Sequence, residues 1–139
     1  MALKVMSLKG QGQLTTAKEV VEQTGGPFDA TARVMQIMAH HGLLKSEQGA
    51  HGGYLVAKDL SKVSFHEFSE MILGPIGLVR CLLDHDEGAC ELHKTCNVRT
   101  PFFELNRRLV DFYRGVTLHE LLRTKESASR VEGSHEAVN

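Results

Sequence analysis

Three cysteines, Cys81, Cys90 and Cys96, lie within sixteen residues of one another and are the side chains of this sequence best suited to chemistry. Because their number is odd, a framework of disulfides is disfavoured, which leaves metal binding, redox chemistry or burial as small apolar side chains. The eight and five residues that separate them match neither the paired cysteines of zinc ribbons nor the spacings of ferredoxins. On spacing alone, all three uses stay open.

The segment around the second cysteine also holds acidic and imidazole side chains that could complete a site. They are Asp84, His85, Asp86, Glu91 and His93, and for each of them a solvated loop side chain is the commoner role. Cys90 and His93 could instead pair as the nucleophile and base of an enzyme. No oxyanion loop, cofactor fingerprint or orienting acid accompanies them, so we predict that the chain is not an enzyme.

The composition allows one domain, or one small domain with an appendage. The chain has 139 residues, of which 42% are hydrophobic, enough to build a core. It has no run of eighteen apolar residues, and its first ten residues lack the apolar stretch of a secretory signal. We therefore expect a cytoplasmic protein with no membrane partner. The net charge of −1 permits nucleic-acid binding without arguing for it, since the 16 Lys and Arg residues could still form a local patch.

The elements that must position the cysteines begin with an apolar segment, which predicts a short helix ended by Gly10. Its apolar side chains are Leu3, Val5, Met6 and Leu8. The pattern starts directly at Met1 without an N-cap residue. We expect from this that the natural protein begins upstream of Met1.

Two further helices are predicted on either side of a tight turn. Thr16 and Glu19 form a capping box at the start of the first, which would run to about residue 23. The Gly-Gly-Pro sequence at 25–27 predicts the turn, after which Asp29 is expected to cap the second helix and Gly42 to end it. The apolar face of the second helix would consist of Ala30, Val34, Ile37, Met38 and His41. This pair predicts a helix-turn-helix.

A short hairpin is predicted directly after that pair. Residues 43–46 and 54–57 favour strands, and residues 48–53 a loop with three glycines in five residues. Such glycines allow positive φ and a close approach to another surface, and we expect a positive φ at Gly52. A hairpin in this place is typical of the wing that tracks DNA phosphates or the minor groove.

The cysteines follow another predicted helix. Ser64 and Glu67 form a second capping box, and the helix would end at the Gly-Pro pair at 74–75. Residues 82–99 show no periodicity and would form the loop that carries two of the three cysteines. The sequence contains no internal repeat.

A long helix is predicted after the loop, with Thr100 as its N-cap, Pro101 in the first position and Glu104 in the first turn. One stripe of this helix repeats apolar residues at spacings of three and four, and we call it the apolar seam: Phe102, Leu105, Leu109, Phe112 and Val116. Such a seam packs lengthwise against another helix, of a second copy or of the same chain. Thr117 would cap a last short helix, and the polar residues from 124 onward are predicted to be disordered.

In this order the elements resemble the Rrf2 family of bacterial transcription regulators, which includes the IscR, NsrR and RirA types. The motifs that carry the resemblance are Leu43-Leu44-Lys45-Ser46 with Gly49 and Gly52-Gly53-Tyr54 in the wing, residues 63–74 with Leu78-Val79-x-Cys81 in the linker, and residues 102–105, Phe112 and Thr117-Leu118-x-x-Leu121 at the end. The resemblance extends from residue 2 to about residue 122.

The resemblance implies a mainly α fold with a small β-hairpin wing (α+β), in which a winged helix-turn-helix is joined to a long dimerisation helix. It divides the chain into a DNA-binding domain at 1–75, a cysteine-containing loop at 76–100, a dimerisation helix with closing turn at 101–123 and a tail at 124–139. It also implies a homodimer, paired through the apolar seam, that binds a palindromic operator in double-stranded DNA.

The resemblance further implies which residues contact DNA. They are Thr16, Asp29, Ala30, Thr31, Arg33, Gln48, Gly49, His51, Gly52, Gly53 and Tyr54. Arg33 is the long donor for guanine or phosphate. Gln48 stands where the family often has Arg, so a phosphate contact of the wing is missing, and His51 at the tip could partly replace it.

By the same resemblance, Cys81, Cys90 and Cys96 are the ligands of an iron–sulfur cluster, either 2Fe–2S or 4Fe–4S. The fourth ligand is open. One branch of the family has a His three residues after the third cysteine, where this sequence has Arg99, and another uses an acidic residue that would precede Met1. His93 is the first candidate in the loop.

Two functional hypotheses follow from the family. In the first, the cluster senses iron, redox state or nitric oxide and controls a regulator, expected to be a repressor. In the second, the regulator has no cluster and is switched by thiol oxidation or by a protein partner.

Overall fold

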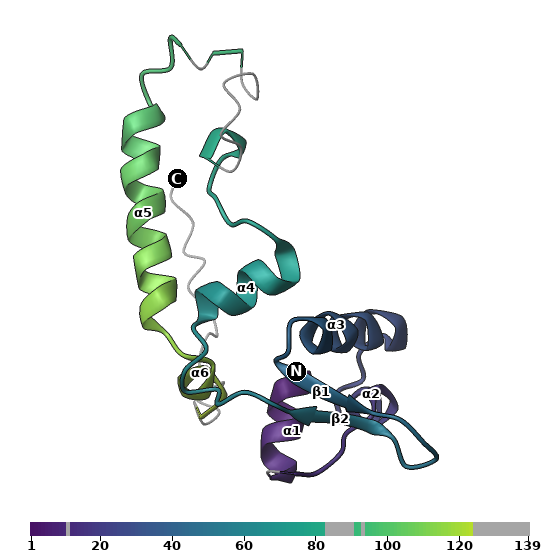
Figure 1. Cartoon of the computed structure of the whole chain (residues 1–139). Helices are drawn as coiled ribbons and strands as arrows, with labels where there is room; N and C mark the ends of the chain where they lie inside the picture. The colour runs from purple at the N-terminus through teal and green to yellow at the C-terminus, as the bar shows by residue number, and fades with distance from the viewer. Residues whose placement is uncertain (11, 83–90, 93, 124–139) are drawn as a thin grey trace, which may run out of the picture.

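The computed structural model describes residues 1–10, 12–82, 91–92 and 94–123 (Figure 1). In chain order its elements are α1 (Ala2–Lys9), α2 (Ala17–Thr24), α3 (Phe28–His40), β1 (Leu44–Glu47), β2 (Gly53–Val56), α4 (Phe65–Leu73), the 3-10 turn η1 (Arg80–Leu82), α5 (Arg99–Gly115) and α6 (Leu118–Arg123). The predicted tail at 124–139 lies outside the described residues. None of the helices within the described ranges is long and apolar enough to cross a membrane.

One core joins the first three helices, the hairpin and the last helix. Its buried side chains are Leu3, Val5, Met6, Val20, Met35, Met38, Leu43, Leu44, Val63 and Leu118. The hairpin pairs β1 with β2 in antiparallel register, with Leu44 opposite Val56 and Glu47 opposite Gly53. Thr15 extends this sheet, because its backbone exchanges hydrogen bonds of 3.0 and 2.9 Å with that of Tyr54. The predicted helix-turn-helix and wing are therefore present, with strand ends shifted by one residue.

Both predicted capping boxes form. The hydroxyl of Thr16 accepts a hydrogen bond from the Glu19 amide at 3.2 Å, while the Glu19 carboxylate accepts one from the Thr16 amide at 2.7 Å. Ser64 and Glu67 repeat the arrangement at 3.1 and 2.8 Å. These bonds from backbone amides hold the pKa of Glu19 and of Glu67 below the ordinary value of 4.5.

The predicted start of α3 is wrong, and its predicted apolar face is right only in part. The N-cap is Pro27, two residues before the predicted Asp29, so Asp29 lies in the first turn and does not cap. Of the predicted face, Met38 is buried and Val34 packs against the core, whereas Ala30 and His41 are exposed and the buried Met35 was not predicted. Apolar side chains at 34, 35, 37 and 38 fit more than one helical phase, which is why the pattern alone missed Met35.

A tight turn connects the end of α3 directly to the wing, with no flexible linker between them. The amide of Gly42 bonds to the carbonyl of Ala39 at 3.0 Å and that of Leu43 to the carbonyl of Met38 at 2.9 Å, which is a Schellman motif. Gly42 has a φ of 71°, a conformation that favours glycine, and Leu43 packs into the core with Met38. Because β1 begins at the next residue, the direction of the wing is fixed by the end of α3.

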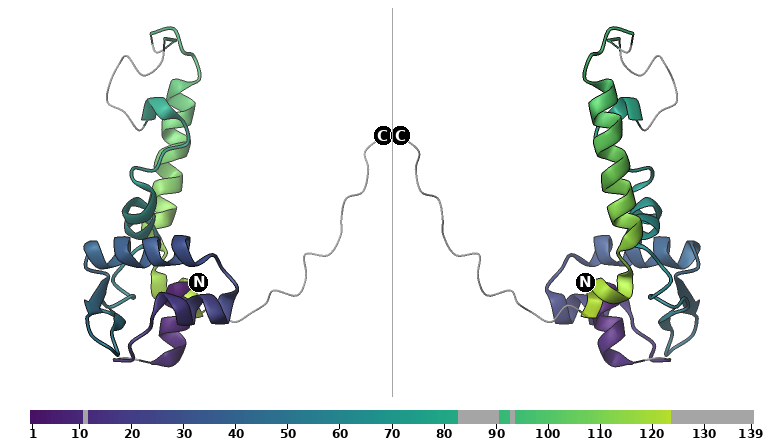
Figure 2. Two further views of the ribbon diagram at one scale, coloured as in Figure 1. Left: turned by 90° about the vertical axis from the view of Figure 1, so that its right-hand side faces the viewer. Right: turned by 90° about the vertical axis from the view of Figure 1, so that its left-hand side faces the viewer.

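The long helix α5 extends away from this unit as a single rod (Figure 2). It begins at Arg99 with Val98 as N-cap, not at Thr100 as predicted, and Val116 lies just beyond its end. Its base is tied to α4 and α6: the Phe65 amide bonds to the Val116 carbonyl at 2.7 Å, and the Leu118 amide to the Val63 carbonyl at 2.9 Å. The Thr117 hydroxyl accepts from the Glu120 amide at 3.2 Å, as predicted for the cap of the last helix.

Candidate nucleic-acid interface and cysteine segment

The outward face of α3 carries most of the residues predicted to contact bases. Asp29, Ala30 and Arg33 are exposed and Thr31 is half-buried, while Met35 and Met38 of the same helix are buried in the core. α3 is thus anchored by its inner face and presents its polar face to solvent, as a recognition helix must.

Two further side chains lie on that outward face, and the residue-level prediction missed them. Gln36 and His40 are exposed and follow Arg33 at three and seven residues. Spacings of three, four and seven bring helical residues to one side, so the periodicity counted from Asp29 and Arg33 could have found both.

The wing residues divide into a tip and a base. Gln48, Gly49 and His51 are exposed at the tip, whereas Gly53 and Tyr54 are half-buried where the hairpin joins Thr15. A Cβ at Gly53 would lie 3.2 Å from the Thr15 carbonyl oxygen, so the base of the wing packs backbone against backbone. The base therefore positions the tip, and only the tip is free to reach a ligand.

The expectation of a positive φ at Gly52 is wrong. Within the described residues of the wing the positive φ belongs to Gly49, at 125°. Gly52 is required for another reason, because a Cβ there would lie 2.5 Å from the carbonyl oxygen of Glu47. Of the two uses expected for the wing glycines, a positive φ and a close approach to another surface, Gly52 therefore serves the second.

Thr16, also predicted to contact DNA, is half-buried, and its hydroxyl is already used as the cap of α2. Glu19, its partner, also accepts from the Lys9 ammonium at 3.0 Å. Lys18, on the first turn of α2, is exposed and lies 3.9 Å from Glu22. At the start of α2, the Lys18 ammonium group is therefore exposed, whereas the Thr16 hydroxyl is already hydrogen-bonded as the helix cap.

The cysteine segment is described in part. Cys81 lies in η1 and Cys96 in the approach to α5, and both are free thiols that are half-buried. Cys90 and His93 lie outside the described residues, as do Asp84, His85 and Asp86. Glu91 is exposed, and so is Arg99 at the start of α5. Among the residues that are described, no three potential metal ligands come together.

The approach to Cys81 is tied to α5. The side-chain oxygen of Asn106 accepts a hydrogen bond from the Leu78 amide at 3.0 Å, three residues before Cys81. Thiolates are soft ligands that favour iron–sulfur clusters, so the donor type fits the group that the family resemblance implies, and neither described thiol is used in a disulfide.

The apolar seam of α5 lies largely uncovered. Phe102, Leu105 and Phe112 are 38%, 54% and 66% exposed, and no side chain of α5 is buried. Leu109 and Val116 are half-buried. The sequence left two packing partners for the seam, the same chain or a second copy. The described core of the same chain does not cover this stripe.

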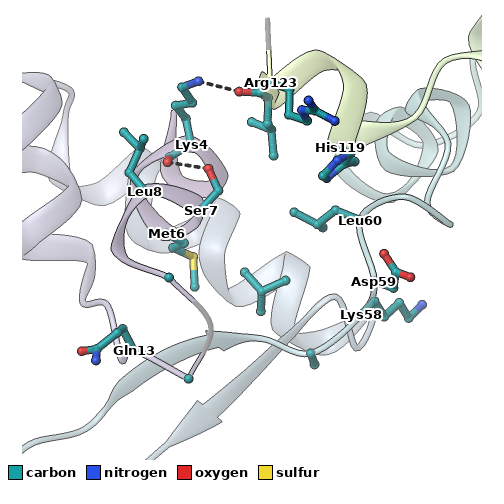
Figure 3. A pocket seen from close by; sticks show the side chains of 15 residues that line it. Lys4, Met6, Ser7, Leu8, Gln13, Lys58, Asp59, Leu60, His119 and Arg123 are labelled. Atoms are coloured by element: carbon teal, nitrogen blue, oxygen red, sulfur yellow. Dashed lines mark hydrogen bonds between the residues drawn. The ribbon is translucent and has the colours of Figure 1, made fainter. Parts of the chain in front are cut away.

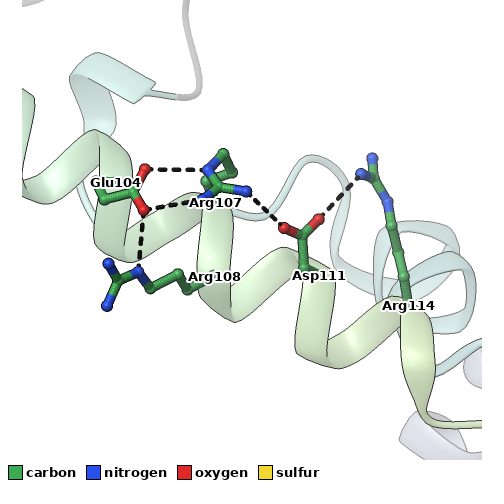
Figure 4. Close-up of polar contacts among 5 residues, drawn as sticks. All are labelled: Glu104, Arg107, Arg108, Asp111 and Arg114. Carbon is green, nitrogen blue, oxygen red and sulfur yellow. Dashed lines mark hydrogen bonds and ion pairs between the residues drawn. The ribbon is translucent and has the colours of Figure 1, made fainter.

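A second stripe of α5 is charged (Figure 4). The Glu104 carboxylate accepts hydrogen bonds from Arg107 and Arg108 at 2.9 to 3.0 Å, and Arg107 continues to Asp111 at 3.1 Å. Hydrogen bonds from the two guanidinium groups lower the pKa of Glu104 from 4.5 to about 2. These pairs link side chains one helical turn apart and stabilise α5 locally.

A cleft of about 910 Å³ lies between α1, the chain after β2 and α6 (Figure 3). Lys4 crosses one side of it, and its ammonium group donates a hydrogen bond to the carbonyl of Leu122. Lys58, His119 and Arg123 also line it, with Leu60 on the same wall. This contact between Lys4 and Leu122 adds to the attachment of α6 to the DNA-binding unit.

Comparison with known proteins identifies the chain. The model of the Rrf2 family, described as iron-dependent transcriptional regulator, matches residues 1–124. The chain belongs to the Rrf2 family. Because family members regulate transcription, the prediction that the chain is not an enzyme is confirmed, and the Cys90–His93 pair is not a catalytic dyad.

Relatives and solved structures agree with the family. The HTH-type transcriptional regulator IscR of Klebsiella pneumoniae is 26% identical over 108 residues, which are 78% of this chain and 64% of that relative. CymR (YrzC), the global cysteine regulator of B. subtilis, has a TM-score of 0.64 at 20% identity and covers 89% of this chain and 92% of its own. T. potens IscR has a TM-score of 0.63 at 18% identity, covering 95% and 83%. The predicted winged-helix fold, mainly α with a β-hairpin, is confirmed.

Proposed function

We propose that this protein is a cytoplasmic, homodimeric transcription regulator that binds operator DNA through α3 and the wing. The observation that carries the proposal is the outward face of α3, which is polar, exposed and held by a buried inner face next to the hairpin. A helix anchored in this way can enter the major groove while the wing follows the backbone. Asp29, Ala30, Thr31 and Arg33 would contact DNA from α3, and Gln48, Gly49 and His51 from the wing tip.

The uncovered seam of α5 supports the homodimer. Exposed aromatic and aliphatic side chains at this density are unfavourable in water and mark an interface. Pairing of two α5 helices along the seam would cover it, and a two-fold symmetric dimer would present two copies of α3, as a palindromic operator requires.

We further propose that Cys81, Cys90 and Cys96 hold an iron–sulfur cluster that controls operator binding, with repression as the expected mode. When bound, such a cluster would supply sensitivity to iron, redox state or nitric oxide. Contacts within the chain would then couple the cysteine segment to the DNA-binding unit. Asn106 holds the Leu78 backbone against α5, and the base of α5 is bonded to the start of α4 through Phe65 and Val116. A change at Cys81 would reach the DNA-binding unit through the Asn106 side chain and the backbone hydrogen bonds at the base of α5.

The test is to purify the 139-residue chain without oxygen and to measure iron, acid-labile sulfide and visible absorption. We expect a brown protein with both elements present, and each of Cys81→Ala, Cys90→Ala and Cys96→Ala should abolish the colour and the sulfide. Operator duplexes selected from a random library should bind wild-type protein differently before and after exposure to air. Stoichiometric zinc without sulfide would contradict the cluster.

The cluster-free alternative is favoured by one observation, the similarity in fold to CymR, which is known both as a global cysteine regulator and in an oxidized form. Colourless protein whose operator affinity still changes on oxidation, and is restored by a thiol reductant, would support that alternative. If the protein is colourless and its operator affinity changes only when a protein partner is added, the proposed DNA binding stands and thiol oxidation is excluded as the switch.

A further inference from the structure

The outward face of α3 presents three different hydrogen-bonding groups in a row. Asp29, Arg33 and Gln36 are exposed and are separated by four and three residues, so they follow one side of the helix. Neither the Arg33 nor the Gln36 side chain takes part in a hydrogen bond or ion pair within the part of the chain that the structure describes. The guanidinium and the amide are therefore available to a ligand without first breaking an internal contact.

The chemistry of each group matches one base edge of the major groove. A guanidinium pairs with O6 and N7 of guanine through two hydrogen bonds, and a Gln amide pairs with N6 and N7 of adenine in the same way. A carboxylate accepts from N4 of cytosine. Since the amide of Gln36 both donates and accepts, phosphate, which only accepts, would use half of its capacity.

We infer that Gln36 is a specificity-determining residue that recognises an adenine close to the guanine contacted by Arg33. This inference rests on the proposed function, since it requires α3 in the major groove. Three residues advance a helix by about 4.5 Å, and successive bases are about 3.4 Å apart along one strand. Each operator half-site therefore contains an adenine within two base pairs of a guanine.

The test combines a protein substitution with a single-atom change in DNA. Operators are first selected from a random duplex library with wild-type chain purified without oxygen, and each adenine is then replaced in turn by 7-deazaadenine, which lacks the N7 acceptor. At one adenine, wild-type affinity should fall about tenfold, the loss expected for a broken bidentate contact. Gln36→Ala should bind the normal operator about tenfold less tightly and show no further loss at that adenine.

Controls separate a lost contact from a damaged protein. Gln23→Ala makes the same change at an exposed position of α2 and should retain wild-type affinity and wild-type sensitivity to 7-deazaadenine. Far-ultraviolet circular dichroism should not differ among the three proteins, because Ala favours helix at least as well as Gln.

The outcomes distinguish the inference from the proposed function. If the wild type selects no sequence and binds all duplexes equally, the proposed function fails. If it selects an operator but the losses from Gln36→Ala and 7-deazaadenine add at every adenine, then Gln36 does not recognise adenine, while the DNA-binding function stands. A selected half-site without adenine near guanine would overturn the inference in the same way.

Discussion

Thr15 has a fully buried hydroxyl whose Oγ1 has no hydrogen-bond partner within the described chain. An unsatisfied buried polar group costs free energy, whereas a methyl group of similar shape does not. Thr15→Val should therefore raise the free energy of unfolding, measured in urea, by about 1 kcal/mol. Thr117→Val is the matched control: its hydroxyl caps the Glu120 amide, so its loss should lower stability by about 1 kcal/mol. A loss of stability in Thr15→Val would mean that the hydroxyl has a partner.

At the level of single residues, local rules were predictable from sequence and tertiary contacts were not. Thr16 and Ser64 could be placed as caps because a capping box depends only on residues three positions apart. The role of Gly52 depends on where the Glu47 carbonyl lies across the hairpin, which no local pattern contains. The start of α3 was misplaced because Asp is a common N-cap, whereas here Pro27 precedes the first turn.

Among the elements, α5 presents two different faces, and the apolar one leads to a prediction about assembly. Phe112 is 66% exposed, so Phe112→Asp should leave the monomer folded while placing an unpaired carboxylate in the paired seam. The cost of about 3–5 kcal/mol expected for such a buried charge should dissociate the dimer. Sedimentation velocity measures this directly. Arg108→Ala, on the charged face, should remain dimeric, and a dimer that persists in Phe112→Asp would exclude the seam as the interface.

The charged face of α5 predicts a pH dependence. The pKa of Glu104 is lowered from 4.5 to about 2 by hydrogen bonds from Arg107 and Arg108, so its stabilising effect is present above pH 4.5 and is lost as the pH falls through about 2. Wild type should be more stable than Glu104→Gln at pH 7, and the difference should disappear near pH 2. A carbon-13 NMR titration at low salt should place the Glu104 pKa near 2, and Arg107→Ala should raise it. A pKa of 4.5 in both proteins would show that the pairs do not form in solution.

The presence of the helices was predicted well because most of them have a capping box, a capping threonine or a clear apolar period, although the starts of α3 and α5 were misplaced. All of the helices expected from sequence are present, and the apolar seam was found from its spacing alone. What covers the seam could not be derived, because a stripe on one helix has the same pattern whether its partner is the same chain or a second copy. Phe102, Leu105 and Phe112 are exposed, so no described part of the same chain covers them.

For the whole molecule, the main surprise is that the last described helix belongs to the core of the first domain. Leu118 is 3% exposed and belongs to the buried cluster that also contains side chains of α1, α3 and β1, although Leu121 of the same helix is 44% exposed. Leu118→Ala should lower the free energy of unfolding by about 3 kcal/mol, and Leu121→Ala by less than about 1 kcal/mol. Urea unfolding at one protein concentration measures both. Equal small losses would mean that α6 is a separate unit.

Leu118 also has a consequence for the order of events during synthesis. A ribosome makes a chain from its N-terminus at roughly 5–20 residues per second, and domains commonly fold as they emerge. Here the core that begins with Leu3 stays incomplete until Leu118 has been made, several seconds after the wing. The cysteine segment and the seam of α5 therefore leave the ribosome before the DNA-binding unit can close. On the proposed function, a nascent chain could therefore bind a metal or a second copy while its DNA-binding surface is still unfinished, and a stalled or truncated product would compete for these partners without occupying operators.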